Sequence, residues 1–281
     1  MKQIIINADD FGRHKLINRA VKFACKKGCL RSTSIMPGGI AFNDAVTIAK
    51  KLPALGVGIH LTLSDGNPVL PPENIPSLVT PQGTFHENHA VFLGLCLHRK
   101  INFDEVRAEL AAQIDKVQRT GLNITHVDSH QHLHHWLPVS KIVLELAERA
   151  GIHAIRISDA KVFEGNYDAM GQIIGRFGLS TLSKLTARQA RKKNFNMPNH
   201  FEGIVAGESI TENFMLRIIK NLPEGTTEVM LHPGTANVVL EDFCRWDHDF
   251  EGELNAVMSP KVMALLEEKN IASVNFAALG N

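Results

Sequence analysis

The chain has 281 residues, of which 44% are apolar and 21% are charged. These fractions are close to those of ordinary folded domains, so a disordered chain is excluded and a sizeable core can form. Thirty basic residues nearly balance twenty-nine acidic ones, and no long basic stripe is present that could neutralise phosphates. A nucleic acid is therefore not expected as a partner. The densest basic cluster is typical of a solvated helix face and consists of Arg188, Arg191, Lys192 and Lys193.

The cysteines and the first residues of the chain bear on where the protein works. Its four cysteines include no CxxC pair, which fits a reducing compartment. The chain passes from MKQ directly into a β-like run at residues 4–6, and it contains no stretch of about 18 apolar residues. We therefore expect a cytoplasmic protein without a transmembrane segment. Contact with a lipid-linked substrate at a membrane surface stays compatible with this expectation.

Short β-branched runs alternate with longer amphipathic stretches along the whole chain. In chain order the pattern predicts strand 3–7, helix 15–27, strand 32–36, helix 41–52, strand 56–61, helix 103–120, strand 123–128, helix 139–150, strand 154–157, a helix within 169–193, strand 201–205, helix 211–221, strand 228–231, helix 261–269 and strand 272–275.

The alternation of strands and helices predicts a parallel sheet with right-handed crossovers. Seven or eight strands favour an α/β fold of the distorted, TIM-like (β/α) barrel class, closed or slightly broken, over an open doubly wound sheet. Such barrels typically hold about 250 residues in one domain, so residues 1–281 are expected to form a single domain. Two loop-like stretches, 67–83 and 233–252, interrupt the pattern, and long loops of this kind often shape a substrate groove.

Two adjacent carboxylates, Asp9 and Asp10, stand where the first strand ends in NADDFG. Neighbours on a strand face opposite ways, but the backbone can turn at a strand end. One carboxylate can then bind a metal ion while the other acts beside it as a general base. The alternative is a pair of N-capping aspartates for the next helix.

Histidines follow three of the later strands. His60 interrupts an apolar run in GIHLTL and His232 follows another in MLHPG, and either alone could be a core histidine. The sequence HVDSHQHLHH places five histidines and one aspartate within ten residues, directly after a β-like run. Because so many polar groups at such a position are costly to bury without a purpose, this is the strongest indication of a site in the chain.

In a (β/α) barrel all of these residues lie at the carboxyl ends of strands, the face that carries active sites. One aspartate and two histidines leave open positions on a metal ion for water and substrate. The metal lowers the pKa of water and polarises a carbonyl, a carboxylate takes the proton, and a histidine assists the leaving group or the oxyanion. This is the chemistry of amide or ester hydrolysis. The ligand set suits Zn²⁺, and an open, water-rich site also suits Mg²⁺.

Five motifs, NADDFG, GIHLTLSDGNPVLPP, IPSL, HVDSHQHLH and MLHPG, resemble in this order the YdjC-like carbohydrate deacetylase family over most of the chain. The family includes chitooligosaccharide deacetylases and the deacetylase associated with hopanoid biosynthesis. The resemblance implies a distorted (β/α) barrel with one divalent metal ion, Mg²⁺ or Zn²⁺. It also implies an N-acetylated amino sugar or glycoconjugate as substrate, and a homodimer.

The same resemblance implies a role for each motif residue. Asp10, His60 and His130 would bind the metal. Asp9 would be the general base, and His232 would assist the leaving amine or the oxyanion. The remaining polar residues would surround these: Asp128 and His126 would orient ligands, His132 and His134 would line the pocket, and Arg156 would position a substrate group or Asp9, or form a structural ion pair.

Two other functions are compatible with the sequence. A metal-dependent phosphoesterase would use the same ligands but would need a basic phosphate clamp, of which Arg156 alone gives a sign. A non-catalytic carbohydrate-binding or metal-binding protein would need aromatic platforms for sugars, yet the chain has two Trp and one Tyr. A metal-dependent deacetylase of N-acetylated amino sugars is therefore the leading hypothesis.

Overall fold

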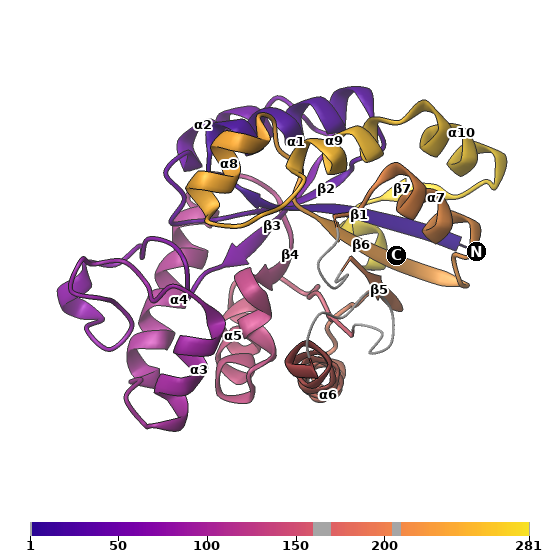
Figure 1. The fold of residues 1–281 in the computed structure, drawn as a ribbon. Coiled ribbons are helices and arrows are strands. Elements are labelled where there is room, and N and C mark those ends of the chain that lie inside the picture. Colours follow the sequence, from indigo (N-terminus) through magenta and orange to yellow (C-terminus); the bar gives the residue numbers. More distant parts are fainter. Residues whose placement is uncertain (1, 160–169, 204–208, 281) are drawn as a thin grey trace.

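A computed structural model describes residues 2–159, 170–203 and 209–280. These residues form a seven-stranded sheet in which all paired strands are parallel (Figure 1). The strand order is β4-β3-β2-β1-β6-β5, and β7 pairs with β1 beside this path. The strands are β1 (Lys2–Phe11), β2 (Ser32–Ile35), β3 (Gly56–Leu61), β4 (Ile124–Ser129), β5 (His200–Glu202), β6 (Gly225–Leu231) and β7 (Ala272–Val274).

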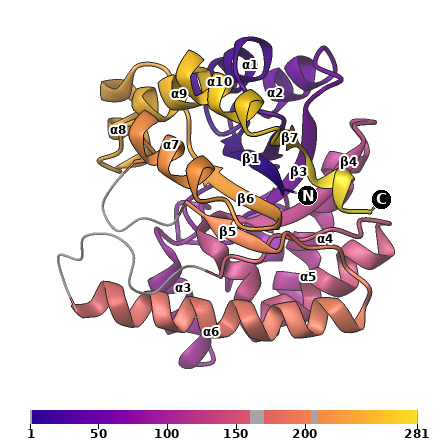
Figure 2. The same cartoon turned by 90° about the vertical axis from the view of Figure 1, so that its right-hand side faces the viewer.

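Helices connect the strands and cover the outside of the curled sheet (Figures 1 and 2). None of the helices that the structure describes is long and apolar enough to cross a lipid bilayer. The α-helices are α1 (Lys15–Lys27), α2 (Phe42–Ala49), α3 (His89–Leu97), α4 (Phe103–Gln118), α5 (Leu137–Arg149), α6 (Met170–Lys192), α7 (Glu212–Lys220), α8 (Asn237–Cys244), α9 (Phe250–Met258) and α10 (Pro260–Glu268), and the 3₁₀ segments are η1 (Pro72–Asn74), η2 (His130–His135) and η3 (Phe276–Gly280).

The barrel is incomplete between the two edge strands, β4 and β5. Residues 154–157, expected to form a strand in this region, make only isolated bridges, from Ile155 to Val127 and from Ala154 to Asn196. The prediction of a strand is wrong because each neighbour pairs with a single residue of the segment, which is too little for a ladder. The expected fold class, a distorted (β/α) barrel with seven or eight mainly parallel strands, is confirmed.

Other element predictions also differ from the structure. Residues 233–252 were expected to be a loop, but they contain α8 and the start of α9. With eight residues, α8 is too short to show a clear helical period. α3 was not expected because its sequence, HAVFLGLCL, is apolar all round and not along one stripe. The strand expected at 201–205 is β5, and residues 204 and 205 lie outside the described residues, as does residue 169 at the start of the range predicted for α6.

β1 lies at the centre of the sheet because its first half is apolar on both faces. Residues 4–6 are isoleucines without exposed surface, which is typical of a central parallel strand. Polar side chains follow toward the carboxyl end. Asn7 donates hydrogen bonds to Asp9 and Ser34, and Ser34 donates to Asp128 across the barrel. The barrel interior is therefore apolar at one end and a hydrogen-bonded polar network at the other.

Candidate active site

The polar residues singled out in the sequence lie together at the carboxyl ends of four strands. Asp9 and Asp10 are near the end of β1, His60 lies in β3, His130 follows β4, and His232 follows β6. Because these strands are parallel, their carboxyl ends meet on one face of the barrel. The structure thus brings together five residues from four segments that are far apart in the sequence.

The end of β1 turns so that both aspartates approach the same histidine. Asp10 has a φ of 62°, in the left-handed region, which aspartate tolerates better than most residues. The register between β1 and β2 shifts at the same place. As a result, Asp9 Oδ2 lies 3.9 Å and Asp10 Oδ1 lies 3.4 Å from His60 Nε2. The two carboxylates stand side by side, although neighbours on a regular strand face opposite ways.

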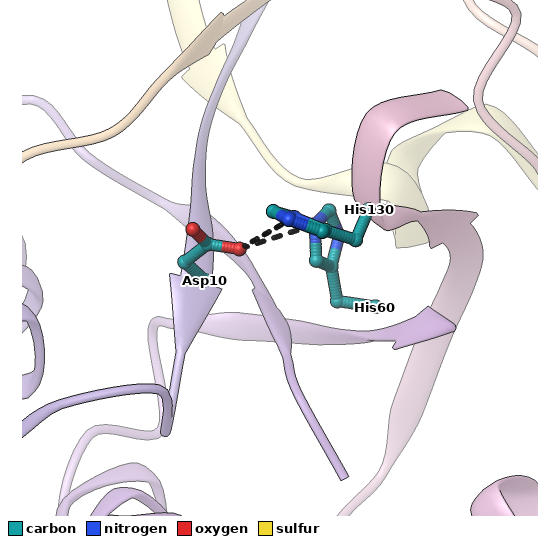
Figure 3. Close-up of side chains that lie close together, drawn as sticks. All are labelled: Asp10, His60 and His130. Atoms are coloured by element: carbon teal, nitrogen blue, oxygen red, sulfur yellow. Dashed lines mark ion pairs between the residues drawn. The ribbon is translucent and has the colours of Figure 1, made fainter. Parts of the chain in front are cut away.

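Asp10, His60 and His130 point toward one another (Figure 3). Asp10 Oδ1 lies 3.4 Å from His60 Nε2 and 3.2 Å from His130 Nδ1. All three residues are buried, and Asp10 Oδ1 has no hydrogen-bond partner among the described residues. An unsatisfied buried oxygen facing two imidazole nitrogens fits a divalent cation, because these are ligand atoms that Zn²⁺ and other transition ions bind.

The charges around these three residues favour a cation. Burial alone would raise the pKa of Asp10, but His130 and Arg13 outweigh burial and hold that pKa well below its usual range. Burial would lower the pKa of His60, yet the neighbouring carboxylates, Asp128 first, outweigh it and raise the pKa to about 10. The carboxylates thus hold a proton tightly on His60, and a metal ion bound by this imidazole would displace that proton.

A fully buried arginine links the carboxylates behind this group. Arg156 donates to both oxygens of Asp9, at 2.6 and 2.7 Å, and to Glu228 at 2.7 Å, and it lies 2.8 Å from Asp128. Burial would raise the pKa of Asp9, but the charge of Arg156 lowers it below its ordinary value, so Asp9 is ionised at neutral pH. Burial raises the pKa of Glu228 to about 8 in spite of Arg156. Of the roles considered for Arg156, its contacts fit both the positioning of Asp9 and a structural ion pair, and its burial leaves no surface for a substrate group.

His232 is held by residues that follow it in the chain. Its backbone N–H donates to Glu253, and its ring lies edge-on to Trp246 and His248, with centroid distances of 5.0 and 5.7 Å. His248 Nε2 lies 3.3 Å from the same carboxylate, so His232, His248 and Glu253 form a second group that could hold a metal ion. Burial lowers the pKa of His232, so its imidazole is mainly neutral at neutral pH and can donate an N–H.

The two histidines expected to line the pocket lie at different depths. His132 lines the cavity over the site and contacts the hydroxyl of Ser158 through Nδ1, at 3.0 Å. His134 is fully buried, with Nδ1 2.6 Å from the hydroxyl of Ser129 and Nε2 3.1 Å from the carbonyl oxygen of Arg156. His132 can therefore meet a substrate, whereas His134 supports the wall.

The two residues expected to orient ligands also differ. Asp128 Oδ1 lies 2.9 Å from His60 Nδ1, the ring nitrogen that points away from Asp10, so it orients this histidine. His126 is instead stacked on Phe276, with ring centroids 3.7 Å apart. It is fully buried, and its surroundings indicate a packing role.

Asp65 and Glu253 contact the site but were not expected from the sequence. Asp65 Oδ2 lies 3.4 Å from His130 Nε2, and Glu253 binds the backbone of His232. Asp65 could have been found from its position in GIHLTLSDG, because it follows the candidate ligand His60 after only four residues. Nothing in the sequence around Glu253 indicated that this glutamate is buried.

A cavity of about 1050 Å³ lies over the site. Its walls come from the strand ends and from both stretches expected to be loops, 67–83 and 233–252, as predicted for a substrate groove. Trp246, 40% exposed, gives it an aromatic face, and the volume is just above the usual range of small-molecule sites, about 300 to 1000 Å³. The residues lining the cavity are Asp9, Arg13, His60, Asp65, Gly66, Asn67, Thr80, Gln82, Thr84, Phe85, Glu87, Asn88, His89, His130, Gln131, His132, Met230, His232, Phe243, Cys244, Arg245 and Trp246.

Comparison with known proteins gives consistent relatives. Residues 3–268 match the family model of YdjC-like proteins. A carbohydrate deacetylase of Thermoanaerobacter pseudethanolicus is 30% identical over 281 residues, covering 99% of this chain and 100% of the relative. One of Brevibacillus brevis is 28% identical over 279 residues, with the same coverage. A solved structure from Enterococcus faecalis V583, described as a cellobiose-phosphate cleavage protein, superposes with a TM-score of 0.78 at 26% identity, covering 99% of this chain and 98% of that one.

Proposed function

Because the chain belongs to the YdjC-like protein family, we propose that it is a metal-dependent hydrolase that removes the acetyl group from N-acetylated amino sugars. The observation that carries the proposal is the approach of Asp10 Oδ1, His60 Nε2 and His130 Nδ1 to one another beside a cavity that is lined by the two histidines, Asp9 and His232. The names of the curated relatives support carbohydrate deacetylation. We propose a chitooligosaccharide or another N-acetylglucosamine conjugate as substrate.

The proposal gives each residue a separate task. Asp10, His60 and His130 hold one divalent ion, Mg²⁺ or Zn²⁺, which when bound supplies Lewis-acid activation of water and of the acetyl carbonyl. Asp9, kept ionised by its arginine partner, takes the proton of the attacking water. His232 donates its N–H toward the carbonyl oxygen or the departing nitrogen. The proton that Asp9 takes from water is passed on to the departing nitrogen as the amide C–N bond breaks, and acetate and the free amino sugar leave.

We further propose that residues 1–281 form one deacetylase domain, which the family match over residues 3–268 supports. The homodimer implied by the family resemblance stays a prediction. Sedimentation of the purified protein would test it.

The arginines near the strand ends weigh against the phosphoesterase alternative. Such an enzyme needs cations free to hold a phosphate. Arg13 is paired with Asp10 and Asp65, and Arg156 is fully buried among carboxylates. Their charges are already compensated, so among the described residues that line the cavity a phosphate would meet Arg245 as its main cationic partner. One exposed arginine is a weak phosphate clamp, which favours chemistry on an uncharged acetyl group.

The test is acetate release from N-acetylglucosamine oligosaccharides and glycolipid analogues, after chelation and after re-addition of single metal ions. We expect activity to disappear on chelation and to return with at least one ion. Asp9→Asn should lower the rate by about 10²- to 10⁴-fold, the usual contribution of a general base. Asp115→Asn, an exposed carboxylate on α4, is the control and should keep the wild-type rate.

No acetate release from any of these sugars with any ion would refute the proposal. Hydrolysis of a phosphoester by the same preparations would then support the phosphoesterase. Sugar or metal binding without turnover, unchanged in Asp9→Asn and His232→Ala, would support a non-catalytic protein.

A further inference from the structure

We propose that Asp65 is a positioning residue for His130, so that both histidines of the site are held in the same way, each by a carboxylate at its outer ring nitrogen. The inference rests on the proposed metal site, because it concerns which nitrogen each imidazole turns toward the metal. The contact between Asp65 and His130 lies at the surface of the cavity, and Asp65 takes no part in breaking the amide bond.

The two imidazoles turn opposite nitrogens toward Asp10. His60 presents Nε2, and its Nδ1 lies 2.9 Å from Asp128 Oδ1. His130 presents Nδ1, and its Nε2 lies 3.4 Å from Asp65 Oδ2. A nitrogen that binds a metal carries no proton, so the proton of each neutral ring is on the other nitrogen. Asp128 and Asp65 are placed to accept these two protons and thereby fix the two tautomers.

Asp65 is itself held from two sides. Arg13 bridges the carboxylates of Asp10 and Asp65, at 2.8 and 2.6 Å. The backbone N–H of Asp65, which has a φ of 49°, donates to the carbonyl oxygen of His86 in a neighbouring loop at 2.7 Å. These contacts hold the carboxylate of Asp65 in place relative to Asp10. Asp65 is therefore a fixed partner for His130 and not a side chain that moves freely in solvent.

The two positioning carboxylates differ in exposure, which makes Asp65 the better one to test. The side chain of Asp128 is fully buried and also pairs with Arg156, so replacing it would disturb the fold. The side chain of Asp65 is 35% exposed and lines the cavity. Replacing Asp65 should therefore loosen His130 while the fold stays intact. Loss of such a partner typically lowers metal affinity by about 10- to 100-fold.

The experiment measures the affinity of metal-free protein for Zn²⁺ by competition with a chromophoric chelator. Wild type is compared with Asp65→Ala, Asp65→Asn and the control Asp242→Ala. Asp242 is an exposed carboxylate of α8 outside the cavity lining, so its removal reports the effect of losing one negative charge. We expect Asp65→Ala to bind Zn²⁺ about 10- to 100-fold more weakly and Asp242→Ala to keep the wild-type affinity. Asp65→Asn, which retains an acceptor oxygen, should fall between them, and it decides the question if Asp65→Ala fails to fold.

A second measurement reads the ring contact itself in the Zn²⁺-loaded protein. Long-range ¹H–¹⁵N NMR of the histidine rings reports the Nε2–H proton of His130. We expect a resolved Nε2–H signal in the wild type, because Asp65 accepts this proton, and loss of the signal by exchange with water in Asp65→Ala, with unchanged urea unfolding midpoints. A purely structural role of Asp65 would move the midpoint and leave the signal as it is.

The outcomes separate this inference from the proposed function. Equal Zn²⁺ affinities in Asp65→Ala and Asp242→Ala, or an unchanged Nε2–H signal of His130, would overturn the positioning role. A wild type that binds no divalent ion would refute the metal site and this inference with it. Zn²⁺ binding that depends on Asp65, without acetate release from any sugar, would refute the proposed reaction alone.

Discussion

Replacement of Arg156 by methionine tests whether one cation holds the carboxylates of the barrel interior together. The side chain has no exposed surface, and its guanidinium contacts Asp9, Asp128 and Glu228 at 2.6 to 2.8 Å. Methionine has a similar length but neither charge nor donors. Arg156→Met therefore leaves two buried carboxylates, Asp9 and Asp128, and the mainly protonated carboxyl of Glu228 without their common partner.

The expected loss is large. Breaking one buried ion pair costs about 3 to 5 kcal/mol, and here three partners are left behind, so a loss of at least about 4 kcal/mol at pH 7.5 is expected. Domains are stable by about 5 to 15 kcal/mol, so the variant should be close to unfolding. In the wild type Arg156 lowers the pKa of Asp9 and of Asp128, so their contribution to stability is present at neutral pH and is lost in acid.

The stability loss caused by Arg156→Met should depend on pH. Without Arg156 the buried carboxyls take up protons more readily than in the unfolded chain, so the variant loses stability as the pH rises. The difference between wild type and variant should therefore shrink between pH 7.5 and pH 5.5.

Urea unfolding at the two pH values measures this difference. Arg119→Met, which breaks an exposed pair with Asp115 on the surface of α4, is the control and should cost about 0 to 1 kcal/mol at both. A loss below about 1 kcal/mol for Arg156→Met, or a larger loss at pH 5.5 than at pH 7.5, would refute the reasoning.

Glu228, Gly58 and His60 each give a further test. The carboxyl of Glu228 has a pKa of about 8 in the folded protein and about 4.3 in the unfolded chain, so wild-type stability falls as the pH rises between these values. Glu228→Gln should remove this fall and raise the free energy of unfolding by about 1 to 4 kcal/mol at pH 9, measured by urea unfolding. An equal gain at pH 5 would contradict this prediction. Gly58→Ala places a Cβ 2.3 Å from the ring of His126 and should lower the free energy of unfolding by about 1 to 3 kcal/mol. Gly94→Ala in α3, where no atom lies within 4 Å of the new Cβ, should raise it by up to about 1 kcal/mol. Equal shifts in the melting temperatures of the two variants would disprove the clash. Zn²⁺ at 100 times its Kd should stabilise the metal-free protein by about 2.7 kcal/mol, and His60→Gln should abolish this gain; a gain that persists would place the ion elsewhere.

The sequence predicted the strands and helices whose periodicity is long or strongly apolar. β1 is the clearest case, because three consecutive isoleucines are followed by polar residues at the strand end. The prediction failed for short elements, where tertiary contacts decide. α8 is only eight residues long, and residues 154–157 have the composition of a strand but lack neighbours of sufficient length.

The approach of Asp10, His60 and His130 to one another could be anticipated, because each follows a β-like run and parallel strands bring such ends together. Their roles stay predictions. The partners of Arg156 could not be anticipated, since they come from three strands and only their side-chain directions bring them into contact. The same holds for Asp65, whose partner His130 lies 65 residues further along the chain.

The polar end of the barrel interior has an evolutionary consequence. The side chains that would carry out the chemistry also fill the space that an apolar layer would otherwise occupy, and Arg156 is both the centre of this network and the partner of Asp9. Selection for folding and selection for activity therefore act on the same positions. A descendant that no longer needed the activity could not lose Arg156 alone, because three buried carboxyl groups would remain without a cation. Inactive descendants should instead show Arg156 and its acidic partners replaced together.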